Sequence, residues 1–355
     1  MWASGPALVN RATPALARAG RLAYGRAQGK NGQIEAMERY TVLSTMKNEG
    51  PFLLEWIAHY RALGFDDIVV CTNDCEDGTD RMLRRLQRMG LARHHPTKIR
   101  KGGIHRSALR QGARYDEVTG ADWVFICDVD EFLNVHAGDG SVRALAEASG
   151  RPDVISVPWR IFGSGGVPAF EDRPVTAQFT RAEPAFDPET HPDTGKFVKS
   201  LFRPSDGIAR VGLHVPIFDT AAEAVISWVL PGGTPYRVNG ETTGAAPVFD
   251  VAQVNHYALR SAESYLVKRD RGRANHSHHV LGVEYWDKFD RNEVEDTSIR
   301  RYDARVAEIL TELRADPRLA RLHRLAVAWH RTRTQAMRAD PRTADLVRHI
   351  CAETA

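Results

Sequence analysis

A run of five apolar residues from Trp123 to Cys127 is followed at once by the three carboxylates of Asp128, Asp130 and Glu131. An unbroken apolar run of this length predicts a strand that is buried on both faces of a parallel sheet. Acids at its carboxyl end would lie at the edge where open α/β sheets bind ligands. Since residues i and i+2 of an extended chain point the same way, Asp128 and Asp130 could hold one hard cation. The alternative is a strand-to-loop junction with solvated acids.

Strands and helices alternate from residue 40 up to this run. A β-rich segment comes first, and Pro51 then stands at the favoured first-turn position of a helix. Strands separated by helices of this length imply right-handed βαβ crossovers. We therefore predict an α/β fold with a mainly parallel sheet flanked by helices. The expected strands are residues 40–46, 67–72 and 123–127, and the expected helices are residues 51–63, 81–89 and 104–118.

The pattern changes after residue 150. Short β-like runs are connected by glycine- and proline-rich segments, and the end of the chain is helical because Asp316-Pro317 and Asp340-Pro341 each predict an N-cap followed by a first-turn proline. The expected later elements are strands at 153–162, 174–180, 197–203 and 249–255 and helices at 318–338 and 342–351. The expected parts are a flexible basic arm (1–36), a domain over 37–275 with halves 37–150 and 151–275, and a helical extension (276–355).

Composition limits the class of protein. The content of 43% hydrophobic and 26% charged residues is ordinary for a soluble globular chain. A net charge of +3, with no zinc-finger spacing, argues against nucleic acid as a partner. The four cysteines form no Cys-x-x-Cys pair, which favours a cytoplasmic protein. Residues 1–34 carry five basic residues and no acid, so this arm could contact the inner face of a membrane peripherally. The oligomeric state is not predictable.

Several separated motifs resemble those of one family. In chain order they are Thr45-Met46-Lys47-Asn48-Glu49, Glu55-Trp56-Ile57 with His59-Tyr60 and Leu63-Gly64, Asn73-Asp74 with Asp77-Gly78-Thr79, Asp128-Val129-Asp130-Glu131-Phe132, Lys199-Ser200-Leu201-Phe202-Arg203-Pro204, Gly212-Leu213-His214, and Asn255-His256-Tyr257 with Arg260-Ser261. Their order and spacing over residues 40–275 resemble GT-A glycosyltransferases of family 2 and the related family 92. The resemblance implies a Rossmann-like GT-A fold whose first half binds the nucleotide and whose β-rich second half binds the acceptor.

The resemblance also implies an activity and a cofactor. Members transfer a sugar from a nucleoside-diphosphate sugar, here expected to be UDP-linked, to a saccharide or glycolipid acceptor, with Mn²⁺ or Mg²⁺. Asp128 and Asp130 match the Asp-x-Asp motif, whose metal ion bridges the diphosphate and stabilises the leaving group. Because Mn²⁺ tolerates an imidazole ligand, His256 is the first candidate for a further metal ligand and His214 the second. Either histidine could instead be structural.

Further residues are expected to bind the donor. The turn at residues 73–80 matches the place where family 2 members hold the base and ribose, although the same residues also favour a turn and a helix N-cap. Lys101 and Arg106 could contact phosphates or could be solvated surface residues. The candidate nucleotide-binding residues are Thr45, Lys47, Asn48, Glu49, Asn73, Asp74, Asp77, Lys101, Arg106 and Asp128.

The catalytic base and the acceptor side are predicted from position. An inverting transferase needs a carboxylate that takes the proton of the acceptor hydroxyl. Asp172, with Glu171, is the candidate base, although the family's usual Glu-Asp at a helix start is not reproduced here. Trp159, Arg160 and Lys199 are the candidate acceptor residues.

Two other functions remain open from the sequence. Phosphatases of the haloacid dehalogenase type also place Asp-x-Asp after a buried strand, but normally after the first strand of the fold. A protein that binds nucleotide sugars or glycans without catalysis is the other alternative. Substitution of Asp128 and Asp130 tests these cases, because a transferase should lose metal-dependent turnover whereas a binding protein has no turnover to lose.

Overall fold

The computed structural model describes residues 37–98, 103–205, 207–219, 225–236, 246–271 and 281–352, and the statements that follow concern these residues. The expected basic arm (1–36) and the candidate phosphate ligand Lys101 lie outside them. In the described part of the chain, no helix combines the length and the apolar character needed to cross a bilayer.

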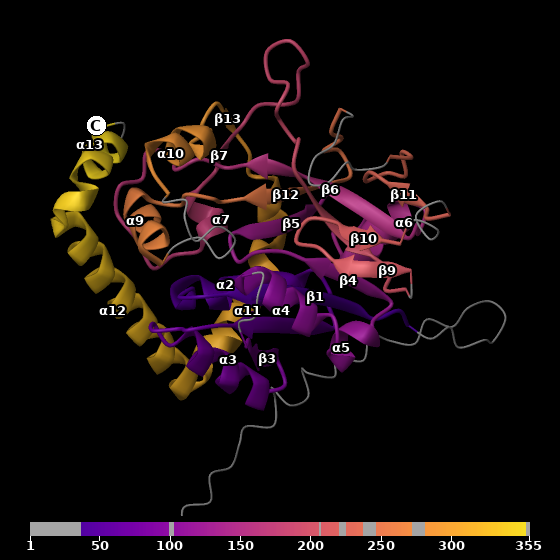
Figure 1. Cartoon of the computed structure of the whole chain (residues 1–355), viewed down its shortest axis with the longest axis horizontal. Helices are drawn as coiled ribbons and strands as arrows, with labels where there is room; N and C mark the ends of the chain where they lie inside the picture. The colour runs from indigo at the N-terminus through magenta and orange to yellow at the C-terminus, as the bar shows by residue number, and fades with distance from the viewer. Residues whose placement is uncertain are drawn as a thin grey trace, which may run out of the picture.

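The centre of the molecule is a nine-stranded sheet (Figure 1). Its first half is parallel in the order β3-β2-β1-β4, and the order continues through β8, β6 and β12 to β5. Antiparallel pairing begins at β8, which pairs with both β4 and β6. The eight strands of this path are β1 (Tyr40–Met46), β2 (Asp67–Thr72), β3 (Arg93–Pro96), β4 (Trp123–Ile126), β5 (Glu131–Val135), β6 (Val154–Ile161), β8 (Val198–Phe202) and β12 (Ala252–His256). The ninth strand, β11 (Trp228–Val229), pairs with β6 off this path.

Alternating side chains of the parallel strands fill two cores. In β4, Trp123 and Phe125 join the larger core, whereas Val124 and Ile126 join the smaller one, as period-two geometry requires. The larger core includes helix α2 (Gly50–Ala62) and the smaller one includes Ala108 and Leu109 of α4 (Ile104–Gly112). Burial on both faces confirms the prediction drawn from the apolar run before Asp128.

The C-terminal helices pack on the α/β core. Helix α12 (Pro317–Ala339) contacts α2, α3 (Thr79–Arg88) and α9 (Ala262–Arg271), and Figure 1 shows it running along one side of the molecule. The predicted N-cap at its start is present, since Asp316 Oδ1 accepts a hydrogen bond of 2.8 Å from the Leu319 N–H. The remaining helices of this region are α10 (Val283–Phe289), α11 (Asp303–Ala315) and α13 (Ala344–Ala352).

The α/β class, the mainly parallel first half and the helical C-terminal extension are confirmed, but two predicted elements differ. The strand predicted at residues 174–180 is wrong, because residues Val175–Gln178 form helix α7. The buried Glu55 carboxylate accepts hydrogen bonds from the Val175 and Thr176 N–H groups of its first turn, which satisfies donors that an isolated turn would leave unpaired. The helix predicted at 104–118 is two helices, α4 and α5 (Asp116–Thr119).

The other elements are short. They are α6 (Val142–Ala148), β7 (Arg181–Ala182), β9 (Ile208–Val211), β10 (Pro216–Phe218), β11 (Trp228–Val229), β13 (Val294–Glu295), η1 (Ser298–Tyr302) and η2 (Pro341–Thr343).

Candidate active site

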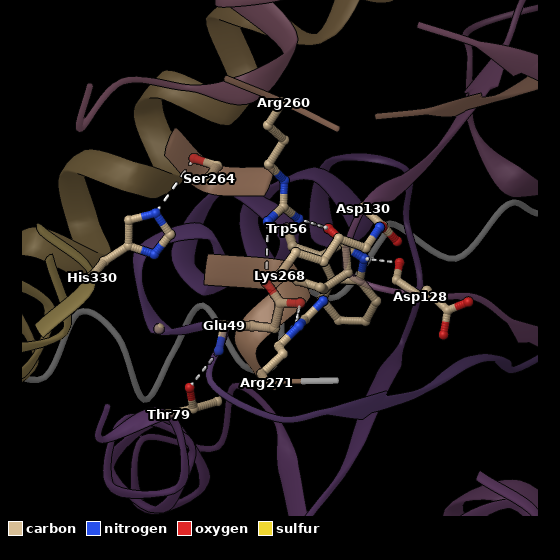
Figure 2. Close-up of polar contacts among 12 residues, drawn as sticks. Glu49, Trp56, Thr79, Asp128, Asp130, Arg260, Ser264, Lys268, Arg271 and His330 are labelled. Carbon is tan, nitrogen blue, oxygen red and sulfur yellow. Dashed lines mark hydrogen bonds and ion pairs between the residues drawn. The ribbon is translucent and has the colours of Figure 1, made fainter. Parts of the chain in front are cut away.

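Three chain segments meet at the carboxyl edge of the parallel strands. Strands β1 and β4 are parallel neighbours, so residues 47–49 and 127–130, which follow them, lie at the same edge. Strand β5 begins at Glu131 and pairs with β12, which brings His256 opposite Glu131. The chain then turns into α9, whose Lys268 and Arg271 point back toward Asp130 and Glu49 (Figure 2).

Asp128 and Glu131 share a buried lysine. Lys199 of β8 is fully buried, and its Nζ lies 3.2 Å from Asp128 Oδ2 and 3.1 Å from Glu131 Oε2. Burial raises the pKa of Glu131, and the charge of Lys199 opposes this shift and favours the ionised carboxylate. Burial alone would lower the pKa of Lys199, but the negative charges of Asp128 and Glu131 outweigh this effect and hold the pKa above its ordinary value. The Asp128 side chain is 26% exposed, so this carboxylate reaches solvent.

Asp130 is paired with a second lysine. Lys268 Nζ donates to Asp130 Oδ2 and to the Ala258 carbonyl oxygen, each over 2.7 Å. His256 Nε2 lies 3.9 Å from the same Asp130 oxygen. Burial alone would raise the pKa of Asp130, but the neighbouring basic groups, Lys268 foremost and then His256 and Arg260, together outweigh burial and the pKa is lowered. Asp130 is therefore ionised and held by Lys268.

Glu49 binds two arginines at the end of β1. Arg260 Nη1 lies 3.1 Å from Glu49 Oε2, and Arg271 Nη1 contacts Glu49 Oε1 and donates to the Lys47 carbonyl oxygen over 2.8 Å. The Arg260 guanidinium also lies 3.6 Å from the ring centroid of Phe52, a cation–π geometry. Each carboxylate of this site, those of Glu49, Asp128, Asp130 and Glu131, thus has a Lys or Arg partner.

The two candidate histidines flank Trp159. Its ring centroid lies 4.1 Å from that of His256 and 5.2 Å from that of His214. Burial lowers the pKa of His256 to about 4 and that of His214 to about 3, so both imidazoles are neutral at neutral pH. His214 Nδ1 bonds to the Val198 carbonyl oxygen over 2.9 Å.

A divalent metal ion does not fit this arrangement. No three His, Cys, Asp or Glu side chains are grouped as metal ligands in the described part of the chain. The Asp128 and Asp130 carboxylates each hold a lysine ammonium, and Asp130 Oδ2 holds it at 2.7 Å. An ion bound to Asp130 would lie beside this ammonium, where unit like charges 4 Å apart repel by about 4 kcal/mol at an effective dielectric of 20.

The candidate nucleotide residues have different surroundings. Asp77 is buried and joins two helix starts, since its carboxylate accepts from the Gly50 N–H of α2 and the Thr79 N–H of α3. Asn48 Oδ1 accepts from the Glu76 N–H, and Asn73 is also buried. Asp74 and Arg106 are exposed, and Thr45 and Lys47 are half-buried at the edge. Their roles in nucleotide binding stay predictions.

The candidate base lies on the loop before α7. Asp172 Oδ1 is 2.9 Å from Nε2 of His323 in α12, and this hydrogen bond lowers the pKa of Asp172. Glu171 is exposed and pairs with Arg173. The loop is next to the site, because Phe170 packs on Phe52 with ring centroids 6.0 Å apart.

The candidate acceptor residues are less accessible than expected. Lys199 is enclosed beneath Asp128 and Glu131, and Trp159 is buried. Arg160 pairs with Asp296 at 3.1 Å. No one of these three side chains offers an open surface, so their acceptor role stays a prediction.

Sequence reasoning missed the three cations that follow β12. Arg260 belongs to one of the motifs that resemble the family, but no function was assigned to it. Lys268 and Arg271 belong to a stretch rich in basic residues, which is typical of an exposed helix end. The side chains of Lys268 and Arg271 are only 18% and 16% exposed. Because burying a charge is unfavourable without a partner, each of these cations is held by a carboxylate. Enclosed Lys and Arg groups that keep further N–H donors at a ligand edge indicate a site for anions.

Known proteins resemble this chain in sequence. The model of glycosyltransferase family 92 matches residues 43–218, which confirms the resemblance. A glycosyltransferase family 92 protein of Ricinus communis is 25% identical over 146 residues, covering 39% of this chain and 25% of the relative. A family 92 protein of Arabidopsis thaliana is 25% identical over 274 residues, 73% of this chain and 42% of the relative. The chain thus spans a quarter to two fifths of the length of these curated relatives.

Solved structures resemble it more weakly. Residues 1–349 of TarS from S. aureus in complex with UDP cover 41% of this chain and 41% of that chain, with 16% identity and a TM-score of 0.26. The complex of the same protein with UDP-GlcNAc covers 89% of this chain and 80% of that chain, with 12% identity and a TM-score of 0.28. At TM-scores this low, these structures say nothing about the residues of the site.

Proposed function

We propose that this chain, whose residues 43–218 match the model of glycosyltransferase family 92, transfers a sugar from a nucleoside-diphosphate sugar to a saccharide or glycolipid acceptor. The observation that carries the proposal is the set of enclosed cations at the carboxyl edge of β1 and β4. A diphosphate is the anionic group common to such donors, and this edge is where open α/β sheets bind ligands.

The reaction needs little covalent chemistry from the protein. The bond between the sugar C1 and the β-phosphate oxygen breaks, and its electron pair leaves with the nucleoside diphosphate. A new bond forms between C1 and the acceptor oxygen, whose proton passes to a carboxylate. The leaving diphosphate gains negative charge, so fixed Lys and Arg groups beside it lower the barrier. Holding both substrates in line supplies much of the remaining rate.

Asp172 is the proposed base, and inversion at C1 is the proposed outcome. The His323 contact supports this role because it fixes the orientation of the Asp172 carboxylate, which is ionised at neutral pH as a proton acceptor must be. The position of the loop supports this role too. Phe170 of the loop packs on Phe52, and the Arg260 guanidinium of the site lies over the Phe52 ring.

UDP is the proposed nucleotide. Asn73 and Asp74 follow β2, the neighbour of β1 in the sheet, and offer amide and carboxylate groups that suit the imide edge of uracil. Asp128, anchored by Lys199 and partly exposed, has the acceptor oxygens that sugar or ribose hydroxyl groups require.

Release of nucleoside diphosphate tests the proposal. The purified chain is incubated with UDP-glucose, UDP-galactose, UDP-GlcNAc or GDP-mannose, with water or added oligosaccharides as acceptor. We expect release from one UDP-sugar and its loss in Asp128→Asn, with the fold unchanged by circular dichroism. Absence of release from every donor, together with absence of any thermal shift with UDP or GDP, would refute the proposal.

A further inference from the structure

The arrangement of Lys268 differs from that of a lysine on the surface of a helix. It lies in the last turn of α9, yet its side chain is only 18% exposed. Two of its three ammonium hydrogens are used by Asp130 and by the Ala258 carbonyl oxygen, each at 2.7 Å. The third has no oxygen or nitrogen acceptor among the described residues, and Nζ lies 5.7 Å from the ring centroid of Tyr285. Lys268 is therefore a fixed cation that retains one donor for a ligand.

Arg271 repeats this arrangement one turn later. Its Nη1 is held by Glu49 and by the Lys47 carbonyl oxygen at 2.8 Å, and the side chain is 16% exposed. A guanidinium has five N–H donors in a planar fork that matches phosphate oxygens. The structure gives its Nε and Nη2 atoms no partner within the described residues. Figure 2 shows Lys268 and Arg271 side by side at the edge that carries Asp128 and Asp130.

The charges at this edge already balance without an added ion. Asp130, the residue that a metal ion would share with Asp128, holds Lys268 instead. A divalent ion would have to displace an anchored ammonium and would leave it enclosed without a counter-ion, which is unfavourable. A diphosphate, in contrast, meets donors that are in place and need no displacement.

We propose that Lys268 and Arg271 bind the diphosphate of the donor in place of a divalent metal ion, so that this chain transfers sugar without a metal. The inference rests on the proposed glycosyl transfer and names the groups that neutralise its leaving group. Both residues lie beyond the residues 43–218 that match the family model. Lys268 contacts the leaving phosphate oxygens, and the carboxylates of Asp130 and Glu49 serve to position the two cations.

Calorimetric titration of UDP into the full chain tests the inference, in parallel with UDP release from the active donor. Both are measured in EDTA and in Mn²⁺. We expect binding and release in EDTA, with Mn²⁺ changing either by less than about threefold. Because Lys268→Met leaves Asp130 unpaired and could unfold the chain, the decisive variant is the charge-balanced Lys268→Met/Asp130→Asn. Loss of a charge-assisted contact should weaken UDP binding in EDTA roughly 10- to 100-fold.

Arg269→Met is the matched control. Arg269 is the neighbour of Lys268 in α9, but its Nη1 donates to the Leu281 carbonyl oxygen, so the substitution should leave UDP affinity unchanged. UDP binding or release that requires Mn²⁺ and disappears in EDTA would overturn the inference and leave glycosyl transfer standing. Metal-independent binding that survives in the double variant would overturn the assignment to Lys268. If no nucleotide binds under either condition, the proposed function fails and the inference with it.

Discussion

Lys199 and Glu131 form an ion pair in which both side chains are fully buried, with Nζ 3.1 Å from Oε2. Lys199→Met should destabilise the fold by about 3–5 kcal/mol, because it leaves Glu131 buried without its cation. The measurement is urea unfolding followed by circular dichroism. The double variant Lys199→Met/Glu131→Gln should recover most of the unfolding free energy that Lys199→Met loses.

Lys196→Met provides the comparison for this pair. Lys196 pairs with Asp193 at 2.9 Å, but its side chain is 47% exposed. An exposed ion pair contributes about 0–1 kcal/mol, so the free energy of unfolding of this variant should be close to that of the wild type. Equal losses of unfolding free energy in Lys196→Met and Lys199→Met would contradict the structural role of the buried pair.

Asp77 links the starts of α2 and α3. Its carboxylate accepts hydrogen bonds from Gly50 N–H over 2.7 Å and from Thr79 N–H over 2.9 Å. Asp77→Ala should therefore lower the free energy of unfolding by about 1–3 kcal/mol, the cost of leaving buried donors unpaired. The affinity of the folded protein for UDP should not change, because both carboxylate oxygens are already used.

Asp74→Ala is the counterpart of this change. Asp74 is exposed in the same turn, and Asn73 Nδ2 approaches it only at 3.4 Å. Its substitution should leave the free energy of unfolding within about 0.5 kcal/mol. If the turn binds the nucleotide, UDP affinity falls in Asp74→Ala and not in Asp77→Ala. The reverse result would make Asp77 a ligand rather than a cap.

Stability should fall in mild acid because of His59. Burial lowers the pKa of His59 from an ordinary value near 6.5 to about 4, against a hydrogen bond to the Leu133 carbonyl oxygen. The unfolded chain then binds the proton more readily, so the contribution is full above pH 6.5 and is lost as the pH falls toward 4. Between pH 7 and pH 5 the loss is about 2 kcal/mol. His59→Gln, measured by urea unfolding at both pH values, should show a shallower decline, and parallel declines would contradict this origin.

The sequence predicted β1, β2 and β4 of the parallel half, but not the ion pairs that connect distant segments of the chain. The β-rich runs at 40–46, 67–72 and 123–126 form β1, β2 and β4, because a strand buried on both faces consists mainly of apolar and β-branched residues. Strand β5 was missed because it starts at Glu131, directly after the acids, and is specified by its pairing with β12. Pairing of that kind depends on tertiary structure and leaves no local pattern.

The same reason explains which site residues were found. Asp128 and Asp130 are recognisable because they follow a strand within one short segment. Lys268 is 138 positions from Asp130, and Arg271 is 222 positions from Glu49. No spacing rule connects residues so far apart, and only the fold brings α9 back to the edge. Tertiary packing therefore determines whether a lysine is a surface residue or an enclosed cation.

Helix α12 approaches the start of α2 closely. A Cβ placed on Gly50 would lie 2.5 Å from the Cβ of Ala326, so no space remains at this crossing. Ala326→Val should cost about 1–3 kcal/mol by overpacking. Ala328→Val, at an exposed position of the same helix, carries the same helix propensity but no clash. The difference in urea midpoint between the two variants isolates the packing, and equal midpoints would show that the crossing adapts.

The base assignment predicts a specific loss of turnover. Asp172→Asn removes the proton acceptor but keeps a side chain of the same shape beside His323, so the fold and UDP affinity should persist. The rate of UDP release should fall about 10²- to 10⁴-fold, the usual contribution of a positioned base. Glu171→Gln is the control, because Glu171 is exposed and pairs only with Arg173 in the described structure. A normal rate in Asp172→Asn with a loss in Glu171→Gln would move the base by one residue. Normal rates in both variants would show that the proton is taken by another group and that the Asp172–His323 contact serves to hold the loop on α12.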